Sequence, residues 1–314
     1  MLSTMVRISL RVSLLVCCLC IFQESIAQQF PYQSSFENSR QIWNPATIKS
    51  EGSKRVDLFM RQQWFGLGAS QSPRYVSASL QIPVEDYNMS FGGGVYNNAT
   101  GPVSSTGLTL NYAYHLDGVF TKYGKLSLAL SGTLNSIGFD PSDEFFNDED
   151  DELLNGDQGS TFFPSLGGGL YYQSSNRKFQ DNFFFIGASL FQAISTDVLI
   201  QRNNFQRELH IFGLVGSNIA FLRGRVEPSL SINLTDPEFV SFTLNGLYEM
   251  QDTFWAGLSY STISDVLIQL GIILPNSRND SEVRLGMLGN MNIGTDLAKA
   301  GPGFEAYISY DFGR

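Results

Sequence analysis

The chain has 314 residues, of which 43% are hydrophobic and 16% are charged, and its formal net charge is −10 at pH 7. The length suffices for one large or two ordinary domains, and the acidic balance argues against a nucleic-acid-binding protein, which needs a basic surface to neutralise phosphates. The low charge, together with 30 Gly, 25 Phe and 13 Tyr residues, is typical of an all-β protein with a large surface in a non-aqueous phase.

Residues 1–27 have the features of a cleaved signal peptide. Arg7 and Arg11 provide a basic start, the run VSLLVCCLCIF is apolar, and the small residues of SIA form a cleavage site after Ala27. We therefore expect an exported mature chain that begins near Gln28. All three cysteines lie in the segment that is removed, so we expect neither a disulfide nor a thiolate metal site in the mature chain.

Residues 28–50 form a separate segment before the first predicted strand. This segment contains Asn44, Pro45 and Ala46. Because a proline biases the residue before it away from the helical conformation, we predict a turn here. The strand-forming region begins after it, at residue 51.

From residue 51 to the end of the chain, apolar residues recur at every second position, which predicts strands with one apolar and one polar face. The clearest alternations lie at 56–64, 76–82, 108–116, 126–134, 184–190, 226–234, 240–248, 254–260, 266–274 and 304–312, and weaker ones lie near 89–97, 165–174, 206–220 and 282–291. Together they predict about 14 strands, an even number typical of closed outer-membrane barrels. No apolar run after the signal peptide approaches the roughly 20 residues of a membrane-spanning helix, so a helical membrane protein is excluded.

The apolar face of such strands can turn toward a protein core or toward lipid. A secreted, soluble pair of β-sandwiches would have strands of about 5 or 6 residues, whereas many of these alternations persist for about 9 to 11 residues, enough to cross a bilayer at a tilt. Aromatic residues also gather near strand ends, where membrane barrels carry interfacial girdles. They occur in QQWF, YAYH, LYYQ, NFFF and DTFW. The sequence therefore favours an all-β transmembrane antiparallel β-barrel of the outer-membrane type over residues 51–314.

The lengths of the predicted connections indicate an orientation. If the first strand starts in the periplasm, every loop after an odd-numbered strand is extracellular. The longest connections, 140–163 and 192–205, follow the fifth and seventh predicted strands, and the connections 116–124, 174–181 and 249–252 after even strands are shorter. We therefore expect 140–163 to be an extracellular loop and 28–50 to lie in the periplasm or in the barrel lumen.

The predicted loop 140–163 is strongly acidic, with Asp148, Asp150, Asp151 and Glu152 close together. Clustered carboxylates suit hard cations such as calcium, and Asp148, Asp150 and Glu152 form a weak candidate set. Their spacing does not match an EF-hand, which places acidic or amide residues at alternate positions before a glycine. A solvated loop without a metal is the favoured interpretation.

The sequence contains no arrangement typical of a catalytic site. The two histidines, His115 and His210, both lie in predicted strands, which favours structural roles on the barrel wall or in the lumen. No G-x-S-x-G, P-loop, G-x-G-x-x-G or H-E-x-x-H motif occurs. We therefore predict a non-enzymatic protein without a cofactor. The glycine runs FGGGVY and LGGGLYY are interpreted as sites of strand bending or close packing.

The chain also resembles the PorP/SprF family of outer-membrane proteins from the type IX secretion and gliding-motility apparatus of Bacteroidetes. The resemblance runs from QIWNPATI through FGGGVYNNATGPVSSTGLTLNYAYHL, KLSLALSGTLNSIGFD, FIGASLFQAI, VEPSLSINL and DTFWAGLSYS to the terminal YISYDFG. The run NNATGP…TGLTLNYAYHL is the most specific part. The resemblance implies an outer-membrane barrel with no catalytic role, which works with other secretion components to secrete or anchor a large cargo protein at the cell surface.

The resemblance supplies no catalytic residues, so the candidate partner-binding residues come from their positions. They are Asn44 and Pro45 in the N-terminal segment and Asp148, Asp150 and Asp151 in the acidic loop. The expected partners are outer-membrane lipid, other type IX secretion components and a large secreted or surface-anchored cargo protein, with no nucleic acid. A porin or a FadL-like transporter of small hydrophobic solutes is the alternative.

Overall fold

The computed structural model describes residues 40–67, 72–139, 159–174, 182–193, 198–200, 203–205, 209–236, 239–250, 253–262, 265–276, 281–293 and 300–312. The predicted signal peptide and the acidic residues Asp148, Asp150, Asp151 and Glu152 lie outside these ranges. Within the described ranges, no helix combines the length and the apolar character that crossing a membrane requires.

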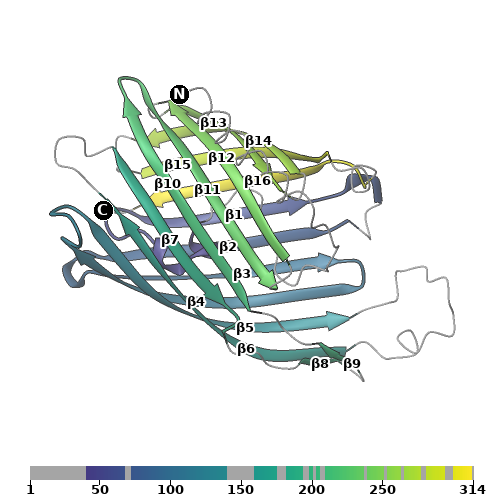
Figure 1. Cartoon of the computed structure of the whole chain (residues 1–314). Helices are drawn as coiled ribbons and strands as arrows, with labels where there is room; N and C mark the ends of the chain where they lie inside the picture. The colour runs from purple at the N-terminus through teal and green to yellow at the C-terminus, as the bar shows by residue number, and fades with distance from the viewer. Residues whose placement is uncertain are drawn as a thin grey trace, which may run out of the picture.

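Fourteen antiparallel strands follow one another in chain order around a closed barrel, and β1 pairs with β16 to close it (Figure 1). The barrel strands are β1 (Lys54–Gln62), β2 (Arg74–Val84), β3 (Met89–Thr100), β4 (Val103–Asp117), β5 (Lys125–Phe139), β6 (Gly159–Gln173), β7 (Phe183–Phe191), β10 (His210–Phe221), β11 (Gly224–Asp236), β12 (Phe239–Met250), β13 (Phe254–Ser261), β14 (Asp265–Asn276), β15 (Ser281–Asn292) and β16 (Gly303–Phe312). A separate two-stranded sheet, β8 (Val198–Ile200) and β9 (Asn203–Phe205), lies in the connection between β7 and β10. The predicted fold class and strand number are confirmed.

Some predicted boundaries are wrong. The alternation predicts a first strand that reaches Trp64, but β1 ends at Gln62, and Trp64 has a φ angle of 57°, a left-handed conformation that does not continue a strand. The predicted loop 140–163 is shorter, because β6 begins at Gly159 and its first residues pair with the end of β5. The β8–β9 sheet falls in a predicted connection, since strands of three residues are too short to give a periodic pattern.

The apolar face of the strands forms the outer surface of the barrel. In β5, Leu128, Leu130 and Leu134 are 44%, 70% and 51% exposed, whereas Ser131 and Asn135 on the opposite face are 4% and 2% exposed. A protein that turns its leucines outward and its serines inward needs a non-aqueous phase around it. The alternative of a soluble β-sandwich pair is therefore wrong.

Aromatic side chains on the outer surface form a girdle near one end of the barrel. Ring pairs on adjacent strands, with centroids 5.6 to 6.0 Å apart, are Phe91 with Tyr112, Tyr172 with Phe184, and Tyr248 with Phe254. Phe120 in the turn before β5 contacts Tyr172, which is only 6% exposed, and Phe221 of β10 stacks on Tyr248 of β12 across β11. Such girdles lie at the boundary between lipid and water. Trp255 and Phe185, which the clusters DTFW and NFFF also place among the girdle candidates, are instead buried inside the barrel, at 2% and 0% exposure.

The first strand starts and the last strand finishes at the same end of the barrel, because Lys54 at the start of β1 pairs with Phe312 at the end of β16. We call this the terminal end and the opposite one the loop end. The aromatic girdle lies near the terminal end. The longest connections between barrel strands, residues 63–73, 140–158, 192–209 and 293–302, all join strand ends at the loop end. As the sequence predicts, the longest connections therefore follow odd-numbered strands, whereas short connections occur at both ends of the barrel.

Candidate functional site in the barrel lumen

Residues 40–50, which we call the luminal segment, lie inside the barrel. The segment contains the short helix α2 (Arg40–Trp43) and the 3-10 turn η1 (Pro45–Thr47), and η1 packs against β4, β5, β6 and β7. Its central side chains are buried: Trp43 is 5% exposed, Asn44 0% and Ala46 1%. The two residues that the sequence analysis proposes for partner binding, Asn44 and Pro45, are thus enclosed by the barrel wall.

Asn44 joins the luminal segment to two adjacent wall strands. Its Nδ2 donates to the carbonyl oxygens of Leu170 in β6 at 3.0 Å and Ala188 in β7 at 3.3 Å. Its Oδ1 accepts from the backbone nitrogen of Ala46 at 2.9 Å, which caps η1. Pro45 occupies the first position of η1, where a fixed φ and a missing N–H are tolerated. The Asn-Pro-Ala sequence therefore forms a compact turn that presents an amide to the wall.

Glycines on the inner face of the wall make room for this turn. A Cβ atom at Gly169 would overlap Asn44 Oδ1, and one at Gly187 would lie 2.9 Å from Asn44 Nδ2. In β3, a Cβ atom at Gly92 would lie 2.7 Å from Ile48 Cδ1. The glycine runs LGGGLYY and FGGGVY thus serve close packing, one of the two interpretations that their sequence suggests.

Apolar contacts surround the same turn. Trp43 stacks on Phe212 with a centroid distance of 5.4 Å and an interplanar angle of 29°, and the Ser189 hydroxyl donates to the Trp43 carbonyl oxygen. The buried cluster consists of Trp43, Ala46, Ala113, Ala129, Tyr171, Phe185, Phe212 and Leu214. Burial of two large aromatic side chains such as Trp43 and Phe212 contributes several kcal/mol, so the segment has its own small core.

Charged and polar anchors hold the segment on the other strands. Arg40 forms an ion pair with Glu227 of β11. Gln41 Nε2 donates to Ser79 Oγ at 2.6 Å, and Lys49 Nζ lies 2.6 Å from Asp311 Oδ1 of β16. The anchors therefore come from widely separated parts of the barrel, which fixes the segment across the lumen.

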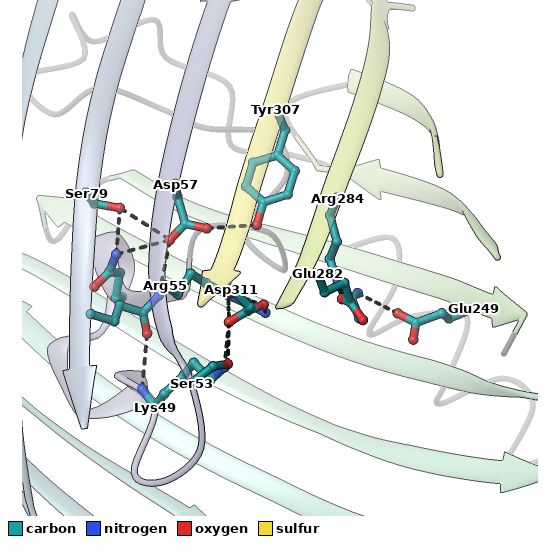
Figure 2. A network of polar contacts seen from close by, with 12 residues as sticks. Lys49, Ser53, Arg55, Asp57, Ser79, Glu249, Glu282, Arg284, Tyr307 and Asp311 are labelled. Carbon is teal, nitrogen blue, oxygen red and sulfur yellow. Dashed lines mark hydrogen bonds and ion pairs between the residues drawn. The ribbon is translucent and has the colours of Figure 1, made fainter. Parts of the chain in front are cut away.

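A polar network continues from Lys49 along the inner wall near the terminal end (Figure 2). Arg55 donates to both carboxylate oxygens of Asp311 at 2.5 to 3.1 Å, and Tyr307 Oη donates to Asp57 Oδ1 at 3.0 Å. Arg284 lies 2.8 Å from Glu249. Charges in a confined lumen are stable because each of these groups has an oppositely charged or hydrogen-bonding partner.

A second apolar cluster and a buried ion pair lie on the opposite side of the barrel interior. The cluster consists of Phe59, Tyr75, Trp255, Leu267, Ile273, Leu288 and Tyr307. Trp255 lies over Gly271 and Gly286 of the next two strands, where an added Cβ atom would collide with its ring. Arg61 and Glu305 lie 3.1 Å apart, with side chains 3% and 0% exposed. Side chains and the luminal segment together occupy both halves of the interior.

The two histidines belong to the wall. His115 is 2% exposed, and its ring nitrogens lie 2.9 Å from Ser90 Oγ and 2.8 Å from Ser127 Oγ. His210 Nδ1 lies 3.2 Å from Thr235 Oγ1. Hydroxyl groups of the wall strands thus occupy both ring nitrogens of His115, which fits the structural role that the sequence analysis favours for it.

The calcium candidate Asp148, Asp150 and Glu152 and the loop candidate Asp151 lie outside the described residues. Within the described part of the chain, no group of three or more His, Cys, Asp or Glu side chains is placed to hold a metal ion. The sequence analysis proposed no role for the inward-facing charges Asp57, Arg61 and Glu305. Their signal was the presence of charged residues on the polar face of the first and last strands.

A closed barrel of fourteen strands with an apolar exterior, an aromatic girdle and a polar lumen defines an outer-membrane β-barrel. The sequence matches the family described as type IX secretion system membrane protein PorP/SprF over residues 25–310. The chain therefore belongs to the PorP/SprF family. Among curated proteins, no match was found.

Solved structures with the same fold include transport barrels. The CymD monoaromatic hydrocarbon channel superposes with a TM-score of 0.53 and 12% identity, covering 88% of this chain and 93% of the channel. A FadL homologue of Pseudomonas aeruginosa gives a TM-score of 0.51 at 9% identity, covering 88% of this chain and 94% of the homologue. The toluene transporter TodX of P. putida gives 0.50 at 10% identity, with coverages of 88% and 94%. At these identities the likeness concerns the fold alone.

Replacing Gly169 tests whether the Asn44 turn is seated on the wall. We expect Gly169→Ala to lower stability by about 1 to 3 kcal/mol, because the new methyl group overlaps Asn44 Oδ1. Gly246→Ala is the matched control, since a Cβ atom there meets nothing within 4 Å. The measurement is the temperature at which the purified barrel loses its folded, fast-migrating form on a gel. Equal unfolding temperatures for the two variants would contradict the seating of Asn44 against Gly169.

Proposed function

We propose that this protein is a non-enzymatic outer-membrane component of the type IX secretion and gliding apparatus, which helps to secrete or anchor specific cargo proteins at the cell surface. The observation that carries the proposal is the match to the PorP/SprF family over residues 25–310. It spans nearly the whole chain, so the proposal concerns the barrel as a unit.

The contents of the lumen favour this proposal over transport of small hydrophobic solutes. The likeness to hydrocarbon channels is a likeness of fold, and fold does not determine function. A transporter needs a continuous path, and here the luminal segment and the Trp255 cluster lie on opposite sides of the described interior, where such a path would run.

Recognition of cargo is assigned to the loop end, which we propose faces the medium. The longest connections join strand ends there, and one of them carries the acidic residues Asp148, Asp150 and Asp151. Long loops on a rigid barrel are the usual place for binding residues. Asn44 and Pro45, by contrast, contact the wall of the barrel itself, which favours a role in seating the luminal segment.

Affinity purification tests the proposal directly. The detergent-solubilised protein, carrying a tag at the loop end, is expected to retain other secretion components or one large surface protein, identified by mass spectrometry. An unrelated barrel purified in the same detergent serves as the control for nonspecific association. Recovery of the barrel alone, together with ion conduction in planar bilayers, would contradict the proposal and support a porin.

A further inference from the structure

A cavity lies between the luminal segment and the barrel wall at the terminal end. Its volume is about 260 Å³. It is lined by Arg40, Ala46, Thr47, Ile48, Lys49, Ser50, Glu51, Lys125, Ser127, Tyr171 and Gln173. Lys125 begins β5 and Gln173 ends β6, so the cavity lies where these strands reach the terminal end.

The lining of this cavity is basic, although the chain as a whole is acidic, with a net charge of −10. Three cations, Arg40, Lys49 and Lys125, line it together with a single carboxylate, Glu51. Arg40 and Lys49 each have a well-buried acidic partner, Glu227 and Asp311, whose side chains are 10% and 8% exposed.

Lys125 differs from the other two cations. Its Nζ donates to Ser50 Oγ at 3.0 Å and lies 3.4 Å from Glu51 and 3.7 Å from Asp117. These two carboxylates are 74% and 61% exposed, so water solvates them and the pairs are weak. The Lys125 charge is therefore available to a ligand that enters the cavity.

The size of the cavity and the weak pairing of Lys125 favour a small anionic group. The volume of the cavity corresponds to about nine water molecules, at roughly 30 Å³ each in the liquid. A side-chain or terminal carboxylate with one or two neighbouring groups fits this space, and a folded domain does not. We propose that the cavity binds a carboxylate group of an acidic peptide segment from a partner protein, with Lys125 as the principal contact.

Such a ligand would touch both the luminal segment and the wall. Lys49 and Ser50 belong to the segment, and Lys125 belongs to β5. A ligand that binds only when the two are together stabilises that arrangement by mass action, so its binding holds the luminal segment in place. This proposal depends on the proposed function only where it names a partner protein as the source of the peptide. The cavity itself belongs to the barrel.

Titration of the purified full-length barrel in detergent, at low salt, tests the proposal. The probes are a dye-labelled tripeptide that ends in a free glutamate carboxylate, the same dye-labelled tripeptide with its terminal and side-chain carboxylates amidated, and inorganic phosphate. We expect the free tripeptide to bind, and we expect Lys125→Gln to weaken this binding about tenfold, since a charge-assisted hydrogen bond is lost. Lys125→Arg retains the charge and is expected to keep most of the affinity.

Lys122→Gln is the matched control, because Lys122 lies in the connection that leads into β5 and is not among the residues that line the cavity. Its Nζ lies 5.8 Å from the centroid of the Tyr123 ring. It is expected to bind the tripeptide as the unmodified chain does. Equal affinities for Lys125→Gln and the unmodified chain, equal binding of the amidated peptide, or binding of phosphate alone would each overturn the proposal. None of these results depends on secretion, so a failure here is distinguishable from a failure of the proposed function.

Discussion

Replacing residues 40–50 by a glycine-serine segment of equal length is expected to convert a closed barrel into an ion-conducting pore. Barrels of about 8 strands are filled by their own side chains, and those of 16 to 18 strands enclose an aqueous channel. With fourteen strands, this barrel lies between these sizes, and the luminal segment occupies the half of the interior that the Trp255 cluster leaves open. We expect single-channel conductance in planar bilayers to rise on the order of tenfold or more.

A single substitution gives a milder version of the same test. Asn44→Ala removes three hydrogen bonds from a side chain with 0% exposure, at a cost of about 1 kcal/mol each, and is expected to produce intermittent openings. Asn97→Ala is the matched control, since Asn97 Nδ2 donates to Thr106 Oγ1 at an exposed site. If the variant with the glycine-serine segment does not conduct ions, the luminal segment does not seal the lumen. Steady ion conduction by the unmodified chain would favour a porin.

Deletion of the gene is expected to remove one large protein from the cell surface almost completely, while the uptake of small solutes changes little. The reason is the proposed role in secretion, combined with the two buried clusters that occupy space in the described part of the lumen. Surface proteins of the deletion strain and its parent are compared by mass spectrometry after surface labelling, and uptake of a small hydrophobic solute is measured in parallel.

Complementation supplies the control for this experiment. A copy of the gene with an epitope inserted near Asn155 is expected to restore the missing surface protein, and the epitope is expected to be labelled on intact cells. Labelling only after the outer membrane is broken would reverse the proposed orientation of the loop end. An unchanged set of surface proteins with reduced solute uptake would contradict the secretion role and favour the transporter.

The strand pattern could be predicted from the sequence because it is a local property. Each strand shows its own alternation, as Leu128, Leu130 and Leu134 do in β5, and successive strands of an antiparallel barrel pair in chain order. The number of strands and the end of the barrel at which the longest connections occur then follow. The predicted strand boundaries are less accurate where the backbone conformation of one residue prevents a strand from continuing. Trp64, with its positive φ, is such a residue after the end of β1.

What the sequence determined by itself is therefore the barrel: its strand number, its low charge and the length of strand that suits a membrane. Only the tertiary structure decided which face is outside and what fills the lumen. Alternation is unchanged when a strand is turned over, so the direction of the apolar face becomes visible only when the barrel closes. The lumen depends on pairs such as Asn44 with Leu170 and Arg55 with Asp311, which are 126 and 256 residues apart. No local pattern connects such residues, because closure of β1 on β16 and entry of the luminal segment bring them together.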